Sequence, residues 1–232
     1  MKTIFLPWDT EFFGIKIAKI DVDSYDKKAI ESSVNSALSE GTDLIYLVIP
    51  DKIDKKEIFQ KNLIDQKVIF RKTLEFLHEK NESVVEYNDR TVDPKLYEIA
   101  LESGKYSRFR LDPMLPYGSY EKLYRIWIEK SAKKNIADSV LVYSENNEIL
   151  GMITVKIIED RGEIGLLAAD YKAQGKGIGS KLICASENFA ISRDRNVMEV
   201  ATQLRNKAAC SFYEKNGYSI DRIFNYYHIW KN

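Results

Sequence analysis

Cysteine and histidine are scarce in this sequence, with two of each among 232 residues. A zinc site needs paired Cys and His ligands at short spacings, and no such pairing occurs, so we expect no metal ion. Cys184 and Cys210 each fall on a predicted helix. Two thiols in a chain of this length are typical of a reducing compartment, and the sequence leaves a disulfide between them open.

An excess of one charge and long apolar runs are also missing. The 35 Lys and Arg residues balance the 35 Asp and Glu residues, so no overall field attracts nucleic acid or an anionic membrane. No apolar run approaches the length of a membrane span, and residues 1–6 are too short for a signal peptide. We expect neither nucleic acid nor a membrane as partner, and a cytoplasmic location.

A glycine-rich stretch stands out between a predicted strand at residues 164–168 and a predicted helix that continues to Phe189. Because glycine has no Cβ, backbone amides in this stretch can turn toward a ligand. A helix that begins here adds unpaired N–H groups and the positive end of its dipole, which suits a pyrophosphate. The stretch consists of Gln174, Gly175, Lys176, Gly177, Ile178, Gly179 and Ser180.

Two common phosphate-binding motifs fit this stretch poorly. A Walker loop requires Lys and then Ser or Thr directly after its last glycine, whereas Ser180 precedes Lys181 here. A dinucleotide fingerprint requires a third glycine at another spacing. A tight turn with a purely structural role remains the alternative to a ligand-binding loop.

A second segment contains a predicted strand at residues 197–201 and a helix that ends at Asn216 and Gly217. Asn206 and Tyr213, near this helix, are seven residues apart. At about 100° per residue, that spacing brings the two side chains to within roughly 20° of each other around the axis. We therefore expect both on one face.

Together the two segments resemble the GCN5-related N-acetyltransferases. The pattern Gln, two residues, Gly, one residue, Gly at residues 174–179 is similar to the acyl-CoA signature of that family. The resemblance implies acetyl-CoA as cosubstrate, with residues 174–180 around its diphosphate. It also implies that the preceding strand supplies backbone N–H donors to the pantetheine arm and the thioester carbonyl, from Leu166, Leu167 and Ala168.

The resemblance assigns roles to two further residues. Asn206 would contact the pantetheine arm, and Tyr213 would protonate the departing thiolate. With a thiol pKa near 8.5 and a phenol pKa near 10, complete proton transfer is uphill by roughly 2 kcal/mol. We therefore expect Tyr213 to release its proton only as the C–S bond breaks.

No general base is equally clear. Glu163 is a candidate because some relatives use a carboxylate there through a water, although a structural Glu is the simpler interpretation. His78 and His228 are interpreted as structural or solvated. Cys210 lies one turn from Tyr213, but no Cys, His and acid arrangement surrounds it, so we interpret it as a small buried thiol.

The order of the predicted elements indicates a mixed α/β fold in two parts. Residues 1–88 predict a smaller N-terminal α/β lobe, and residues 89–232 predict an acetyltransferase domain with a central, mostly antiparallel sheet. In the lobe we expect a loop and strand (1–20), a helix (26–41), a strand (44–49), a short helix around 58–63 and a strand (68–77). The second part begins with a helix between Asp93 and Gly104 and ends with a strand at 220–230.

Scattered residues narrow the resemblance to the bacterial TDP-4-amino-sugar N-acetyltransferases, the TDP-fucosamine acetyltransferase family. They are Trp8, Asp9, Phe12, Phe13 and Gly14; Ser107, Arg108 and Phe109; Tyr124, Trp127 and Ile128; and Thr202, Gln203, Asn206, Ala209 and Tyr213. This resemblance implies acetyl transfer to the 4-amino group of a TDP-linked 4-amino-4,6-dideoxyhexose for cell-surface polysaccharide synthesis. It also makes Arg108 a candidate substrate-binding residue.

Other interpretations stay open at this stage. Arg108 and Arg110 flank Phe109, which favours either a grip on a diphosphate or an ordinary solvated pair. The chain as a whole could acetylate a peptide or polyamine amine, or bind CoA as a sensor without turnover. The sequence does not disclose the sugar stereochemistry, the acyl length or the oligomeric state, for which a homodimer is one option.

Overall fold

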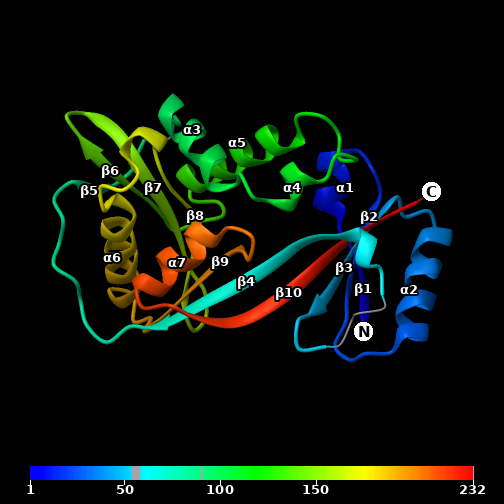
Figure 1. Ribbon diagram of the computed structural model, residues 1–232. Helices are drawn as coiled ribbons and strands as arrows, with labels where there is room; N and C mark the ends of the chain where they lie inside the picture. The colour runs from blue at the N-terminus through cyan, green and yellow to red at the C-terminus, as the bar shows by residue number, and fades with distance from the viewer. Residues whose placement is uncertain (54–57, 90, 232) are drawn as a thin grey trace.

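The computed structural model describes residues 1–53, 58–89 and 91–231, drawn in Figure 1. The strands are β1 (Lys2–Phe5), β2 (Ile17–Asp21), β3 (Leu44–Pro50), β4 (Leu63–Thr73), β5 (Val84–Glu86), β6 (Ser139–Glu145), β7 (Glu148–Ile157), β8 (Gly162–Ala169), β9 (Val197–Gln203) and β10 (Ser219–Trp230). The α-helices are α1 (Pro7–Phe13), α2 (Lys27–Ser39), α3 (Pro94–Ser103), α4 (Arg108–Leu111), α5 (Ser119–Ala132), α6 (Ile178–Ile191) and α7 (Lys207–Lys215), and the 3₁₀ helices are η1 (Gln60–Asn62) and η2 (Tyr171–Ala173).

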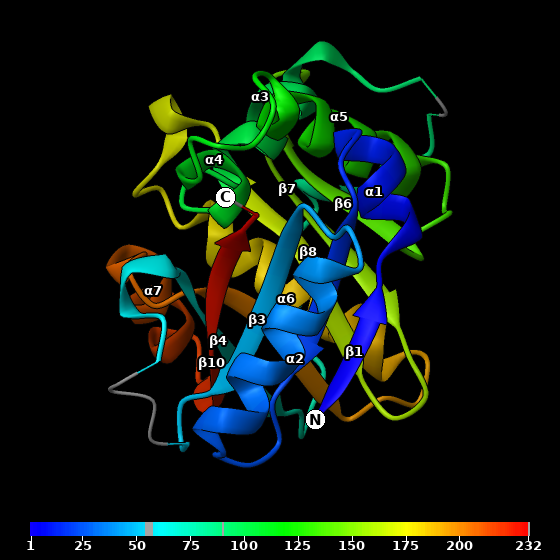
Figure 2. The ribbon, with the colours of Figure 1, turned by 90° about the vertical axis from the view of Figure 1, so that its right-hand side faces the viewer.

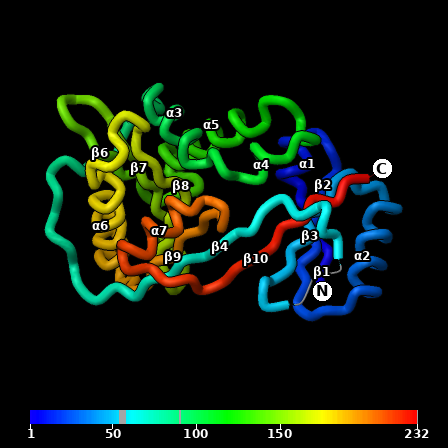
Figure 3. The backbone as a smooth tube through the Cα atoms, in the orientation of Figure 1, coloured from blue at the N-terminus to red at the C-terminus, as the bar shows by residue number. Residues whose placement is uncertain are grey.

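These strands form one sheet in the order β1-β2-β3-β10-β4-β9-β8-β7-β6-β5. The β2–β3 and β8–β9 pairs are parallel, and the other pairs are antiparallel. The prediction of a mixed α/β fold with a mostly antiparallel sheet is therefore confirmed. Strands β4 and β10 run side by side through the middle of the molecule, between the half that holds β5–β9 and the half that holds β1–β3 (Figure 1 and Figure 3).

Helices cover both faces of this sheet. Ile45 and Leu47 of β3 belong to the apolar core beneath α2, which stands in front of β3 in Figure 2. Tyr46 belongs to a different core, together with Phe109 of α4 and Leu123 of α5. Because successive residues of a strand point to opposite faces, α2 and α4 lie on opposite sides of the sheet. At the other end of the sheet, α6 and α7 cover a third core.

The division of the chain at residue 88 remains a prediction. In space, strands from the two sides of that residue alternate. β10 lies between β3 and β4, and β4 lies between β10 and β9. The two predicted parts therefore share one continuous sheet.

Local signals in the sequence placed several helices correctly. Asp26 and Asp93 cap α2 and α3 by accepting hydrogen bonds from the N–H groups of Ala29 and Lys95. The prediction of a loop before the first strand was wrong, because β1 and α1 occupy most of residues 2–13. Pro7 opens α1 and Gly14 closes it with φ +69°. Where a short helix was expected around residues 58–63, the structure has the 3₁₀ helix η1. Residues 54–57 lie outside the described residues.

Candidate functional site

The site begins where two parallel strands separate. β8 and β9 pair only from Gly162 with Met198 to Ile164 with Val200. Beyond these pairs β8 continues to Ala169 and β9 to Gln203. The facing edges of the two strands are therefore open along this stretch.

The open edge of β8 presents fewer donors than the sequence predicted. The Leu166 N–H donates to the buried Thr154 Oγ1 at 2.8 Å, where β7 and β8 shift register. Successive amides of a strand point to opposite edges, so the Leu167 N–H faces the opening toward β9. Of the three predicted backbone donors, Leu166 is already engaged with β7, and Leu167 is the one directed into the opening.

A cavity of about 470 Å³ lies between the glycine-rich loop, the end of α3 and α7, and we call it the cradle cavity. Gly175 and Gly177 have φ of +82° and +75°, a conformation that L side chains rarely adopt. Gly177 caps α6, so the free N–H groups of the first turn of α6 border the cavity. These features suit a bound diphosphate.

Most of the predicted cofactor-binding residues line the cradle cavity. They are Leu167, Ala168, Gln174, Gly175, Gly177, Ile178, Gly179, Ser180 and Asn206. Leu166 borders a neighbouring cavity instead, and Lys176 is exposed and lines neither.

The end of α3 contributes residues to the cradle cavity that sequence reasoning missed. Glu102 accepts a hydrogen bond from Gln174 Nε2 at 3.2 Å and pairs with Lys105. Both charged residues line the cavity. A Glu and a Lys at the end of a helix are equally common on a solvated surface, so the sequence did not identify Glu102 and Lys105 as cavity residues.

A second cavity, of about 220 Å³, adjoins the first on the side of β4 and α4. We call it the Asp65 cavity. The charged side chains that line it are Asp65, Lys67 and Arg108. Five residues line both cavities, namely Ser103, Leu167, Asn206, Ala209 and Tyr213. The predicted neighbours Asn206 and Tyr213 are thus brought together at the junction.

Tyr213 projects from α7 to this junction. Its ring contacts those of Phe70 and Phe212, with centroid distances of 5.5 Å and 5.4 Å. The side chain is 5% exposed, and its hydroxyl makes no hydrogen bond to another described residue. Burial raises the pKa of Tyr213 above its usual value. The phenol therefore keeps its proton at neutral pH and can act as a donor toward either cavity.

Asp65 is a buried carboxyl that the sequence analysis did not single out. It is 2% exposed, and its Oδ1 has no hydrogen-bond partner among the described residues. Burial raises the pKa of Asp65 to about 6, against the opposing attraction of Arg108. At neutral pH this group is a carboxylate that can accept a proton.

Arg108 lies on the same side of the sheet as Asp65. Its guanidinium carbon is 4.2 Å from the Phe109 ring centroid, 4.7 Å from that of Tyr226 and 5.2 Å from that of Tyr46. Arg110 instead is exposed and lies near Tyr120. The two arginines therefore do not form a joint grip on one diphosphate, because α4 turns them to different sides.

A buried network fixes α4 against the sheet. Asp112, which follows α4, accepts a hydrogen bond from Trp230 Nε1 at 3.0 Å and lies 2.5 Å from His228 Nδ1. Burial lowers the pKa of His228, so its imidazole is neutral at neutral pH and Nδ1–H donates to the carboxylate. The structural interpretation of His228 agrees with this geometry.

The other candidate residues lie outside both cavities. Glu163 pairs with Arg161 at 3.0 Å, and His78 Nε2 lies 2.5 Å from the buried Glu187. Cys210 is buried, and burial raises the pKa of its thiol. It and Cys184 are both free cysteines.

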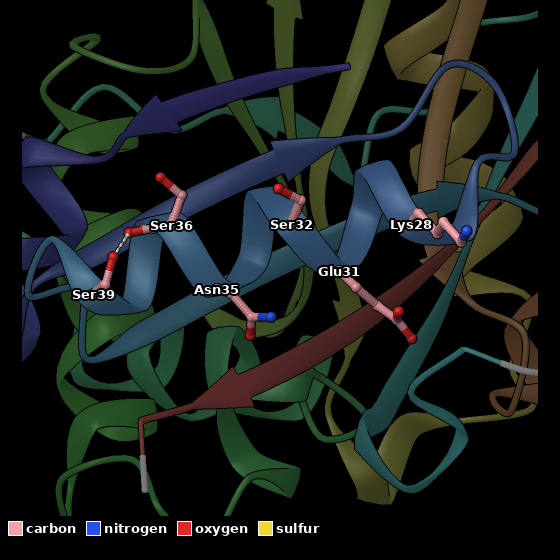
Figure 4. Close-up of a pocket in the computed structure, with 6 residues that line it drawn as sticks. All are labelled: Lys28, Glu31, Ser32, Asn35, Ser36 and Ser39. Atoms are coloured by element: carbon pink, nitrogen blue, oxygen red, sulfur yellow. Dashed lines mark hydrogen bonds between the residues drawn. The ribbon is translucent and has the colours of Figure 1, made fainter.

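A further hollow, of about 670 Å³, runs along the outer side of α2. All six residues that border it belong to this one helix (Figure 4). It is the solvated face of an amphipathic helix, far from the glycine-rich loop in Figure 1.

Two further features were sought in the part of the chain that the structure describes. It contains no group of three His, Cys, Asp or Glu side chains placed to hold a metal ion. None of its helices combines the length and apolar character that crossing a membrane would require.

Comparison with known proteins identifies the family. A model of the acetyltransferase (GNAT) family matches residues 98–218. The chain belongs to the GNAT family. GNAT acetyltransferases use acetyl-CoA, so the prediction that the chain is an acyl-CoA-dependent N-acetyltransferase is confirmed. The match covers the second half of α3, α4–α7 and β6–β9, which include most walls of the cradle cavity.

The individual relatives share low sequence identity with this chain. A dTDP-fucosamine acetyltransferase of Escherichia coli O6:H1 is 23% identical over 218 residues, or 93% of this chain and 92% of that protein. The spore coat polysaccharide biosynthesis protein SpsD of Bacillus subtilis is 26% identical over 57% of this chain, which spans less than half, 46%, of that protein. A GCN5-related N-acetyltransferase from Sphaerobacter thermophilus has TM-score 0.62 and 10% identity over 99% of this chain and 76% of its own.

Proposed function

We propose that the protein transfers the acetyl group of acetyl-CoA to the 4-amino group of a TDP-linked 4-amino-4,6-dideoxyhexose, for cell-surface polysaccharide synthesis. The observation that carries the proposal is the junction at Tyr213. A diphosphate cradle lies on one side of it, and a cavity with a buried carboxylate and a guanidinium lies on the other.

In this proposal the cradle cavity holds acetyl-CoA. Residues 174, 175 and 177–180 of the glycine-rich loop surround its diphosphate with backbone N–H groups, and Asn206 contacts the pantetheine arm. The thioester then lies in the opening between β8 and β9, where the Leu167 N–H donates to its carbonyl oxygen. A fixed donor at that point stabilises the negative charge that develops as the amine attacks.

The proposed reaction includes two proton transfers, one to Asp65 and one from Tyr213. The attacking amine loses a proton as the C–N bond forms, and Asp65 accepts it, because its pKa of about 6 keeps it ionised at neutral pH. Tyr213 donates a proton to the sulfur as the C–S bond breaks. The raised pKa of Tyr213 makes earlier release less favourable than for a free phenol.

Arg108 recognises the acceptor on the Asp65 cavity side. A guanidinium held among aromatic rings presents fixed donors to oxygen atoms of a sugar or phosphate. The cavity volume of about 220 Å³ is smaller than a pocket for a whole drug-sized ligand, which suits one sugar ring. The name of the E. coli relative supports a TDP-linked amino sugar as the acceptor.

A cytoplasmic location, without nucleic acid or membrane partners, is part of the same proposal. The proposal is compatible with a homodimer.

The test incubates the full chain with acetyl-CoA and a panel of TDP-4-amino-6-deoxy sugars, and measures both thiol release and product mass. We expect one sugar nucleotide to gain one acetyl group, with turnover well above that of spermine or peptides. Turnover with spermine or a peptide alone would show that the acceptor is not a sugar nucleotide. No thiol release with any amine would reject acetyl transfer altogether.

A further inference from the structure

Lys67 lies beside Asp65 in the acceptor cavity of the proposed transferase. Both residues are on β4, two positions apart, so their side chains leave the same face of the sheet. Both line the Asp65 cavity, which shares Tyr213, Asn206 and Leu167 with the cradle cavity. A primary amine of the protein itself therefore lies in the cavity where the acceptor amine is proposed to bind.

The surroundings of Lys67 keep it from being an ordinary ion-paired lysine. Its ammonium makes no ion pair or hydrogen bond with another described residue. Burial lowers the pKa of Lys67, and the nearby charge of Arg108 lowers it further, whereas Glu163 and Asp65 oppose the shift. A larger fraction of this amine is therefore unprotonated, and nucleophilic, than for a solvated lysine.

Another lysine of the same strand provides a contrast. Lys72 lies on the opposite face of β4 from Lys67, where Glu187 binds its ammonium at 2.8 Å. Its side chain is 21% exposed, but it lines neither cavity of the site. The two lysines thus share a strand and differ in ion pairing and in access to the thioester.

We propose that Lys67 is a self-acetylation site, which accepts the acetyl group when no acceptor fills the Asp65 cavity. This inference rests on the proposed function. The Lys67 Nζ lone pair attacks the thioester carbonyl, the C–N bond forms and the C–S bond breaks. Nζ gives its proton to Asp65, and the CoA sulfur receives one from Tyr213, so the products are acetyl-lysine and free CoA.

Acetylation at this point changes the cavity. The neutral amide removes one of the two cations that line it and adds the volume of an acetyl group beside Asp65. The modified protein keeps its cradle cavity but has less room for an acceptor. Self-acetylation would therefore lower acceptor turnover without lowering acetyl-CoA affinity.

The test uses the full chain with acetyl-CoA and no acceptor, followed by peptide mass spectrometry, with calorimetry of acetyl-CoA binding in parallel. We expect Lys67 to reach an acetyl occupancy at least about tenfold above that of Lys72 or of exposed Lys176, because Lys67 lines the Asp65 cavity and these two lysines line neither cavity. Heat-unfolded protein should lose the preference for Lys67. Tyr213→Phe should slow the acetylation of Lys67, and the sugar nucleotide should suppress it.

Lys67→Arg should remove the preferred acetyl group from the intact mass while it retains the positive charge. Tight acetyl-CoA binding with no preference for Lys67 would overturn the self-acetylation proposal and leave the proposed function standing. Absence of acetyl-CoA binding would overturn both.

Discussion

The cradle cavity and the Asp65 cavity meet at Tyr213, yet the chain builds them in different ways. The cradle cavity is lined mainly by two short stretches, residues 167–180 and 206–213, and by the end of α3. The Asp65 cavity depends on side chains from β4, α4, α5, β8 and β9, which are far apart in sequence. The first arrangement suits a constant ligand portion bound through amides, and the second can change its acceptor by a few side-chain substitutions.

Tyr213→Phe tests the point where the two cavities meet, and we expect the largest effect there. Loss of the phenolic proton should lower kcat by about 10²–10³-fold, because the thiolate then leaves without a positioned acid. Acetyl-CoA affinity, measured by calorimetry, should stay within about twofold, because the ring and its packing remain. Unchanged turnover would remove Tyr213 from the chemistry.

Asp65→Asn tests the acceptor side alone. We expect kcat/KM for the acceptor to fall by about 10²-fold, with no loss of acetyl-CoA affinity. In the parent protein the pH profile of kcat/KM should fall below about pH 6, because the carboxyl becomes protonated there. That acid limb should disappear in the variant, and its persistence would assign the limb to another group.

The same variant should be more stable than the parent at neutral pH. The folded-state pKa of Asp65 is raised, so folding favours the protonated form and stability decreases as pH rises from about 4 to about 6. Replacing the buried carboxylate with a neutral amide should raise the free energy of unfolding at pH 7 by about 1–3 kcal/mol. Asp21→Asn, at a partly exposed ion pair with Lys19, should change it by less than about 0.5 kcal/mol.

Arg108→Lys tests whether the Asp65 cavity binds the acceptor through the paired N–H donors of a guanidinium. We expect the acceptor KM to rise about tenfold while the acetyl-CoA KM stays constant, because Lys cannot reproduce the planar donor pair or its stacking. Arg110→Lys is the matched control, since Arg110 is exposed and lies near Tyr120 instead. Equal effects of the two variants would contradict a specific role for Arg108.

Gly177→Ala tests the backbone of the cradle, where we expect the smallest effect. An alanine at φ +75° costs about 1–2 kcal/mol of strain, so the loop should shift and acetyl-CoA affinity should fall about fivefold. Gly14→Ala is the matched control, with φ +69° and equally open space around the new Cβ. Both variants should lower Tm, and only Gly177→Ala should weaken acetyl-CoA binding.

The same contrast explains what the sequence could predict. The glycine loop, α6 and α7 are each continuous in sequence, so their spacing indicated most of the cradle cavity and the position of Tyr213 relative to Asn206. Asp65 and Lys67 alternate with the buried Val68 and Phe70 along β4, as the polar side of a solvated strand would. Residues of α4, α5 and α7 enclose the cavity that Asp65 and Lys67 line, and the periodicity of β4 carries no information about these distant neighbours.

The central position of β10 has a consequence for how the protein is synthesised. Among the strands of the described residues it comes after the others in sequence order, yet it lies between β3 and β4. While a ribosome has not yet released residues 219–230, the β1–β3 group and the β4–β9 group have no strand to join them. Each growing chain therefore exposes two unpaired strand edges until residues 219–230 have been made, and until then pairing with neighbouring nascent chains or capture by chaperones competes with closure of the sheet.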